Sequence, residues 1–217
     1  MIPIWQTILS WIYPLNIEKV NSSISGELQV NLQYGNLVVD TETANYSFGN
    51  LHLIFQEAIY QLNLSQEREY KVLILGFGAG SIANILINEN GLNCTITGIE
   101  LDNEIIKLSK KYFFTNLKKQ TTVLNTDALE FVKTNTASYD LVFVDLFIDT
   151  QVPITFQTID FLKGLKKTIS PNGQVLMNSL KNGVKLLKNW EQVFKHFDII
   201  KVQGNQVLYF TNRLKDT

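Results

Sequence analysis

The chain has 217 residues, of which 45% are hydrophobic and 18% charged, so it can bury a large core and is not a disordered protein. Nineteen basic and twenty acidic side chains give a net charge of −1, which disfavours a dedicated nucleic-acid-binding protein. One cysteine and two histidines exclude an intrachain disulfide and a CxxC motif and leave little for a zinc site, so we expect a cytoplasmic protein without a metal.

The first thirteen residues are apolar, and no lysine or arginine precedes Lys19, unlike in a signal peptide. The run is too short, and too interrupted by polar residues, to span a bilayer. It predicts an amphipathic helix over residues 4–13, with Trp5 and Ile8 on its apolar face. We expect this helix to pack on its own domain, with contact to a second copy or to a membrane as alternatives. Its polar face lacks the cations that an anionic membrane would attract, so we expect no membrane partner.

Residues 1–64 are expected to form a small N-terminal region. Residues 26–33 alternate between apolar and polar, which predicts a half-buried strand, and residues 37–39 predict the second strand of a hairpin. Residues 48–62 have apolar side chains at helical spacing. A polar connection then leads into a second domain, residues 65–217.

Strands and helices alternate through this second domain, with a turn at Pro171–Gly173 and a Gly-Asn hairpin signal near the end. The expected strands are 71–75, 94–99, 121–124, 140–144, 174–177, 198–202 and 206–210, and the expected helices are 81–88, 104–113, 128–133, 155–168 and 184–195. This order predicts an α/β fold with a Rossmann-like, doubly wound, seven-stranded sheet. The sheet is mostly parallel and finishes with one antiparallel strand.

The turn after the first of these strands is rich in glycine, with Gly76, Gly78 and Gly80 in the spacing G-x-G-x-G. Glycines at this place let the backbone approach a ligand, and the next helix offers its N-terminus. The spacing differs from the G-x-G-x-x-G of dinucleotide-binding proteins, which disfavours a nicotinamide-dependent oxidoreductase. A merely structural tight turn is the alternative.

Three acidic residues follow the next three strands: Glu100, Asp127 and Asp145. Because the carboxyl ends of parallel strands meet at one edge of a sheet, these side chains should lie beside the glycine turn. A carboxylate at Glu100 can accept both hydroxyls of a ribose, and Asp127 can accept from an adenine amino group. Asp127 can also cap the helix that follows it. The pattern therefore predicts an adenosyl-ligand site.

The segment from Tyr70 to about Ser179 resembles the catalytic domain of spermidine synthases and of their class I methyltransferase-fold relatives, whose sheet also ends in a hairpin. The matching stretches are Val72–Gly80, Gly98–Asp102, Asn125–Ala128 and Tyr139–Asp145. Upstream, Glu42, Tyr46 and His52 match the spacing of the family's D-E-x-x-Y-x-E-x-x-x-H stretch.

This resemblance implies a cofactor, S-adenosylmethionine or its decarboxylated form, and a small-molecule acceptor. The residues implied to bind the cofactor are Gly76, Phe77, Gly78, Gly80, Glu100, Leu101, Asp127, Ala128 and Asp145. Asp145 and Tyr46 are the implied catalytic residues, the first as a base or as a holder of a cationic acceptor, the second as a wall of the acceptor site. Since members of the resembled family commonly associate, the resemblance implies a homodimer, with the first helix and the hairpin as its contacts.

Three departures from the family pattern matter. Polyamine synthases have an acid at the position of Ala79, a glutamate at the position of Phe48, and D-S-S-D-P where this chain has the longer spacing Asp145–Asp149. A diamine in a partly buried site needs carboxylates or aligned dipoles around its charges. We therefore predict an S-adenosylmethionine-dependent methyltransferase of unknown small acceptor. The alternative is a spermidine synthase-type aminopropyltransferase, in which acids such as Glu42 and Asp149 would converge on the acceptor, and the third hypothesis is a non-catalytic adenosyl-binding protein.

Overall fold

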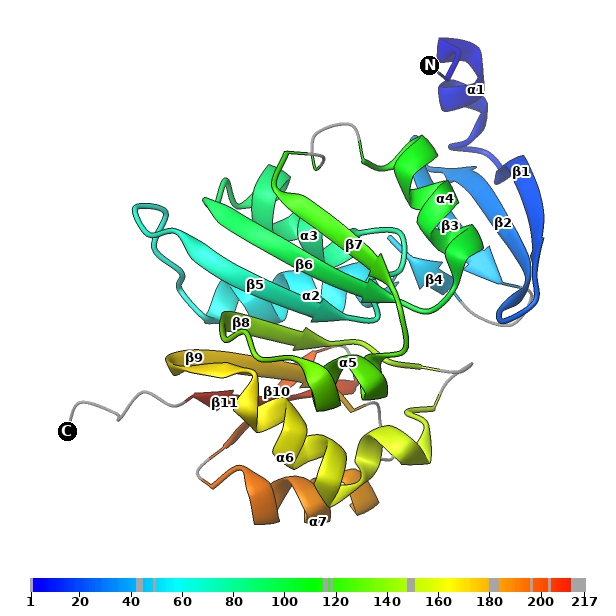
Figure 1. Cartoon of the computed structure of the whole chain (residues 1–217). Coiled ribbons are helices and arrows are strands. Elements are labelled where there is room, and N and C mark those ends of the chain that lie inside the picture. Colours follow the sequence, from blue (N-terminus) through cyan, green and yellow to red (C-terminus); the bar gives the residue numbers. More distant parts are fainter. Residues whose placement is uncertain are drawn as a thin grey trace.

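The structure is a computed structural model. It describes residues 2–41, 45–48, 50–114, 117, 119–147, 151–179, 184–195, 197–202 and 204–211, with the backbone alone at 45–47, 50, 51, 184 and 185. Two sheets organise these residues (Figure 1). One is a four-stranded antiparallel sheet near the N-terminus, and the other is a seven-stranded, mostly parallel sheet with helices on both faces.

The seven-stranded sheet confirms the predicted α/β fold. Its strands are β5 (Tyr70–Leu75), β6 (Cys94–Glu100), β7 (Thr121–Asn125), β8 (Tyr139–Val144), β9 (Ile169–Asn178), β10 (Asp198–Val202) and β11 (Asn205–Thr211). They lie in the order β10-β11-β9-β8-β5-β6-β7. All neighbours pair in parallel except β11, which runs antiparallel to β9 and to β10.

Helices cover both faces of this sheet because its central strands present buried apolar side chains on both faces. In β5, Val72 and Ile74 face one hydrophobic cluster, and Leu73 and Leu75 face the other. The first cluster includes side chains of α2 (Asn50–Gln61), α3 (Ser81–Asn84) and the π-helix η1 (Ile85–Glu89). The second includes side chains of α5 (Ala128–Thr134), α6 (Ile159–Lys167) and α7 (Val184–Val193).

The N-terminal sheet has the order β1-β2-β3-β4 and packs against α4 (Asn103–Tyr112). The predicted hairpin is present as β2 (Gly26–Gln33) and β3 (Asn36–Thr41), while β1 (Leu15–Ser22) and β4 (Asn45–Ser47) were not predicted. The pairing of β1 with β2 shifts register between Asn16 and Glu18. Such an irregularity interrupts the alternation of apolar and polar residues, so β1 lacks the pattern of a strand.

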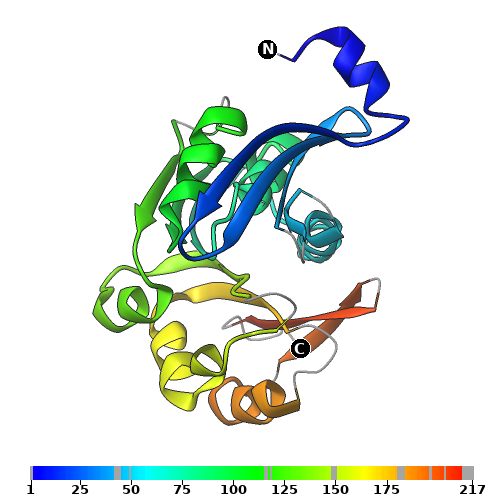
Figure 2. The same ribbon diagram turned by 90° about the vertical axis from the view of Figure 1, so that its right-hand side faces the viewer.

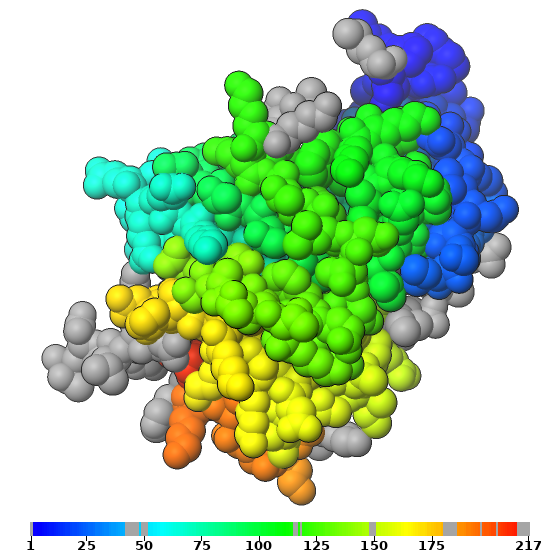
Figure 3. Space-filling model, in the orientation of Figure 1, coloured from blue at the N-terminus to red at the C-terminus, as the bar shows by residue number. Residues whose placement is uncertain are grey.

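The first helix departs from its prediction. Helix α1 spans only Ile4–Leu9, and none of its residues is buried. It projects from the rest of the molecule in all three overall views (Figures 1, 2 and 3), so the expectation that it packs on its own domain is wrong. The residues after it contact the β2–β3 turn: the hydroxyl of Ser10 accepts a 2.9 Å hydrogen bond from the N–H of Gly35, and the ring of Trp11 meets that of Tyr34 edge to face. Within the helix, Ile4, Trp5 and Ile8 are 79%, 62% and 65% exposed.

Two smaller expectations also change. Pro171–Gly173 lies inside β9, where the pairing with β8 shifts register between Tyr139 and Leu141, so it forms an irregularity in the strand instead of a turn before it. The helix expected over residues 155–168 is divided into the 3₁₀-helix η2 (Ile154–Gln157) and α6, because Thr158 caps the start of α6. Among the described residues, no helix has the length and hydrophobicity needed to cross a bilayer.

Candidate active site

The strand order brings the predicted site residues to one edge of the large sheet. In the order β8-β5-β6-β7, the strand ends present Asp145, then the glycine turn, then Glu100, then Asp127 (Figure 1). Because these four strands are parallel, their carboxyl ends share one rim, where open α/β sheets bind ligands. The sequence prediction of a common rim is thus consistent with the fold.

The glycine turn takes a backbone conformation that requires glycine. Gly76, Gly78 and Gly80 have φ angles of +80°, +57° and +99°. At Gly76 a Cβ atom would also lie 2.2 Å from the carbonyl oxygen of Asp145. The turn and the end of β8 are therefore in direct backbone contact.

Phe77, which the resemblance implied to bind the cofactor, has its side chain in the core. Its ring is buried beneath the turn, so close to Gly98 that a Cβ there would lie 2.3 Å from the ring. Its N–H donates to the carbonyl oxygen of Ile99. The ring of Phe77 packs against the turn from the core side, and its N–H is bonded to the end of β6. Phe77 shapes the site without offering its side chain to a ligand.

Glu100 lies at the end of β6 and is buried. One carboxylate oxygen accepts a 2.8 Å hydrogen bond from the N–H of Gly78, and the other accepts one of 3.0 Å from the N–H of Asp102. Burial raises the pKa of Glu100, and the two backbone donors oppose this effect. A carboxylate has four lone-pair positions, so each oxygen can still accept a ribose hydroxyl.

Asp127 and its neighbours form the β7 side of the rim. Oδ1 of Asp127 accepts from the N–H groups of Leu129 and Glu130, which makes it the N-cap of α5, while Oδ2 makes no bond within the described part of the chain. Ala128, the first residue of α5, is buried. Leu101 is 49% exposed, so its side chain is available to cover an apolar ring.

Asp145 is partly buried at the end of β8, and its Oδ1 accepts a 3.3 Å hydrogen bond from Nδ2 of Asn178. Burial raises the pKa of Asp145 to about 7, an effect that the Asn178 hydrogen bond opposes. A carboxyl group with this pKa can both accept and release a proton near neutral pH. Sequence reasoning missed Asn178, although its place at the end of β9, beside β8, was a usable signal.

The acceptor side of the site lies partly outside the described residues. Glu42 and Asp149 are outside them, and Tyr46 is described only as part of the backbone of β4. Phe48 is described, and its ring stacks on His52 at 5.6 Å and on Phe113 at 4.6 Å between ring centroids. Phe48 therefore belongs to a group of three stacked rings.

The structure gives a physical reason for Ala79. This residue is buried in the contact between the glycine turn and the N-terminal sheet. The side chains of its hydrophobic cluster are Leu28, Val30, Val39, Ile105 and Leu108. An acid at this position would be desolvated without a polar partner among these side chains, so alanine is favoured here.

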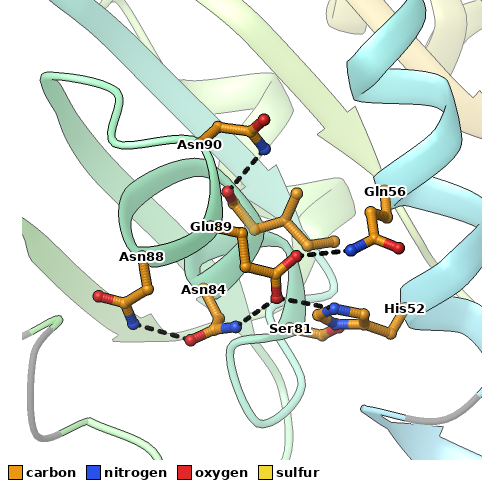
Figure 4. A network of polar contacts seen from close by, with 8 residues as sticks. His52, Gln56, Ser81, Asn84, Asn88, Glu89 and Asn90 are labelled. Atoms are coloured by element: carbon orange, nitrogen blue, oxygen red, sulfur yellow. Dashed lines mark hydrogen bonds and ion pairs between the residues drawn. The ribbon is translucent and has the colours of Figure 1, made fainter.

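His52 lies beside the glycine turn, as Figure 4 shows. Its Nδ1 is 2.7 Å from the hydroxyl oxygen of Ser81, and its Nε2 is 2.9 Å from Oε1 of Glu89. Sequence reasoning singled out His52 but neither Ser81 nor Glu89. Glu89 lies at the end of a π-helix, and no simple periodicity relates it to His52.

A model of the spermine/spermidine synthase domain matches residues 52–200 of this chain. The polyamine aminopropyltransferase of Saccharolobus solfataricus is 24% identical in an alignment that covers 88% of this chain and 71% of the relative. A solved spermidine synthase in complex with the transition-state analogue AdoDATO has a TM-score of 0.72 at 13% identity, covering 91% of this chain and 74% of that chain. Human methyltransferase-like protein 13 in complex with SAH has a TM-score of 0.65 at 18% identity, covering 78% of this chain and 85% of that chain. At such identities these two structures show the fold alone.

Proposed function

Because the chain belongs to the spermine/spermidine synthase family, we propose that it is an aminopropyltransferase that uses decarboxylated S-adenosylmethionine and an amine acceptor. The match over residues 52–200 carries this proposal, since it includes the glycine turn, Glu100, Asp127 and Asp145. A relative named polyamine aminopropyltransferase supports the same reaction. The order of the two sequence-based predictions is thereby reversed, with aminopropyl transfer ahead of methyl transfer.

The residues of the rim fit an adenosyl group. The turn at Gly76 leaves no space for a side chain but lets the backbone approach a ligand, and Glu100 keeps acceptor positions for a ribose. The exposed Leu101 offers apolar surface for a base, and Oδ2 of Asp127 offers an acceptor for an amino group. When bound, the donor supplies a carbon activated by its sulfonium.

Asp145 is the residue that we assign to proton transfer. An amine attacks carbon only through its lone pair, so an ammonium acceptor must first give up a proton. Burial raises the pKa of Asp145 to about 7, which makes its carboxylate a stronger base than an exposed aspartate. The amide of Asn178 fixes the orientation of the carboxyl group. Asp145 thus accepts the proton, while the rim holds the two substrates in line.

A methyltransferase is the second candidate, and one observation favours it. Ala79 is enclosed by apolar side chains, and Phe48 is stacked between other rings, so neither position offers a charge to an ammonium group. A methyl donor that keeps its carboxylate, used with a neutral acceptor, needs less compensation of this kind.

The two candidates release different products. We expect methylthioadenosine when the protein is incubated with decarboxylated S-adenosylmethionine and a diamine such as putrescine, and no release when either is omitted. Formation of S-adenosylhomocysteine from S-adenosylmethionine with a panel of small acceptors, without methylthioadenosine, would replace the proposal by the methyltransferase. Binding of an adenosyl ligand with neither product would favour the non-catalytic hypothesis.

A further inference from the structure

A polar network joins α2 to the start of α3 beside the glycine turn (Figure 4). The hydroxyl of Ser81 lies 2.7 Å from Nδ1 of His52, and Nε2 of that ring lies 2.9 Å from Oε1 of Glu89. Oε1 of Glu89 also accepts from the amide of Asn84, and Oε2 accepts from the amide of Gln56, each at 2.8 Å. Glu89 is therefore held by three nitrogen donors from two helical segments.

The local backbone places Glu89 in this network. Residues 85–89 form a π-helix, in which the N–H of Asn90 donates to the carbonyl oxygen of Ile85 at 3.0 Å. A π-helical turn carries one residue more than an α-helical turn, changes the direction of the side chains at its end, and often occurs at functional sites. The side chains of His52 and Glu89 are 14% and 30% exposed, so water only partly weakens their attraction.

The carboxylate of Glu89 determines the hydrogen-bonding role of Ser81. An acceptor at Nε2 favours the imidazole tautomer with its proton on that nitrogen, which leaves Nδ1 as an acceptor. The hydroxyl proton of Ser81 then points to Nδ1 of His52, and the remaining lone pairs of its oxygen face away from the imidazole. With a neutral imidazole, the Ser81–His52–Glu89 relay has a net charge of −1.

The relay reaches the part of the rim where the non-adenosyl end of a donor belongs. Glu100 and Asp127 place the ribose and base on the β6–β7 side, so the donor's chain must extend over the glycine turn toward Asp145. Ser81 directly follows this turn and is partly exposed. Its hydroxyl oxygen keeps acceptor positions beside the turn, where Ala79 provides no charge.

We propose that the hydroxyl oxygen of Ser81 accepts a hydrogen bond from the ammonium group of the aminopropyl donor, with His52 and Glu89 as positioning residues. This proposal rests on the proposed function. The start of a helix disfavours a cation, and the negative charge that Glu89 brings through His52 offsets this effect. A carboxylate on the same carbon of the donor would meet both the lone pairs of Ser81 and the charge of Glu89. The relay therefore selects the decarboxylated donor over S-adenosylmethionine.

Direct binding measurements test this selection without any turnover. Dissociation constants for decarboxylated S-adenosylmethionine and for S-adenosylmethionine are measured by calorimetry on the wild-type chain and on four variants. We expect Ser81→Ala to weaken binding of the decarboxylated donor about tenfold or more, the effect of losing a hydrogen bond to a charged group, and to leave S-adenosylmethionine within about twofold. Ser81→Thr, which keeps the hydroxyl, should restore the preference.

Two charge-neutralising variants separate the effect of the Ser81–His52–Glu89 relay on donor binding from the effect of surface charge in general. Glu89→Gln should reduce the preference for the decarboxylated donor in the same direction as Ser81→Ala. Glu57→Gln is the matched control, because Glu57 lines the same surface groove as Glu89 but accepts its hydrogen bond from Gln61. It should leave both dissociation constants unchanged. Thermal melting of each variant reports whether the fold is kept.

Three results would overturn the proposal: a wild-type preference for S-adenosylmethionine, an equal loss of both donors in Ser81→Ala, or equal effects of Glu89→Gln and Glu57→Gln. The release of methylthioadenosine by the wild-type chain is a separate readout. If it is released while Ser81→Ala leaves the donor preference unchanged, only the relay proposal fails. If it is not released while the preference shifts as expected, only the proposed function fails.

Discussion

The rim of the large sheet and the N-terminal sheet are held in place in different ways. At the rim, two of the acids, Glu100 and Asp127, bond to backbone N–H groups close to the strand ends. The N-terminal sheet is joined to the α/β part by side chains that are distant in sequence, such as Ser22 with Asp102 and Glu18 with Lys111. Backbone geometry therefore sets residue identity at the rim, whereas long-range side-chain partners set it in the N-terminal sheet.

The strongest test of the rim is Asp145→Asn. We expect the rate of aminopropyl transfer to fall about 10²- to 10⁴-fold, because the amide keeps the shape of the side chain and its contact with Asn178 but cannot accept a proton. In the wild type, the rate should rise with pH with an apparent pKa near 7. Measured kcat values between pH 5 and 9 check both expectations. A variant that retains full activity would remove Asp145 from proton transfer.

The same residue couples activity to stability. Burial raises the pKa of Asp145 from 3.8 to about 7, so the folded state binds this proton more tightly than the unfolded state. Its contribution to stability is fully present below pH 3.8 and is lost as the pH rises to about 7. At pH 8, Asp145→Asn should therefore raise the free energy of unfolding, by at most about 4 kcal/mol. Urea unfolding at pH 5 and pH 8 measures the difference, and an equal effect at both values would contradict it.

Gly76→Ala tests the backbone of the rim directly. A methyl group there would lie 2.2 Å from the carbonyl oxygen of Asp145, and the φ angle of +80° is strained for alanine. We expect a loss of more than about 3 kcal/mol in unfolding free energy. Gly26→Ala is the control, since its φ is +71° and a Cβ there meets nothing within 4 Å. The control should lose only about 1 kcal/mol of unfolding free energy. Equal losses in the two variants would show that the contact of residue 76 with Asp145 does not affect stability.

Asp102→Ala tests the junction of the two regions. Asp102 is buried, caps α4 through the N–H of Glu104, and accepts from the hydroxyls of Ser22 and Ser25. Its removal leaves these donors without their acceptor and should lower the free energy of unfolding by about 2–4 kcal/mol. Asp102→Asn keeps an acceptor for the cap of α4 and should lower the free energy of unfolding by a smaller amount. If both substitutions had only a small effect in urea unfolding, the junction would contribute little to the stability of the fold.

The smallest effect is expected at the N-terminal helix. Trp5 is 62% exposed and α1 has no buried residue, so Trp5→Ser should change the free energy of unfolding by less than about 0.5 kcal/mol. Trp190→Ser, in the core, should prevent stable folding by comparison. Thermal melting at two protein concentrations is the measurement. A large, concentration-dependent effect of Trp5→Ser would indicate that a second copy covers this helix.

Much of the α/β part could be predicted because its signals are local. Continuous apolar runs such as Leu73–Leu75 predict buried parallel strands, and the glycine turn and the acids follow those strands directly. The strand β1 was missed because its register shift breaks the alternation that identifies a strand. The projecting helix α1 was misjudged, since an apolar face indicates burial without saying what it contacts.

The sequence by itself determined the order of the strands in the α/β part, the need for glycine at three turn positions and the common rim of Glu100, Asp127 and Asp145. These features depend on residue spacing and on backbone conformation, which act over a few residues. Only the tertiary structure decided that Phe77 points into the core, that Ala79 is enclosed by the N-terminal sheet, and that His52 joins Ser81 to Glu89. Those contacts join segments distant in sequence, and packing determines which of them meet.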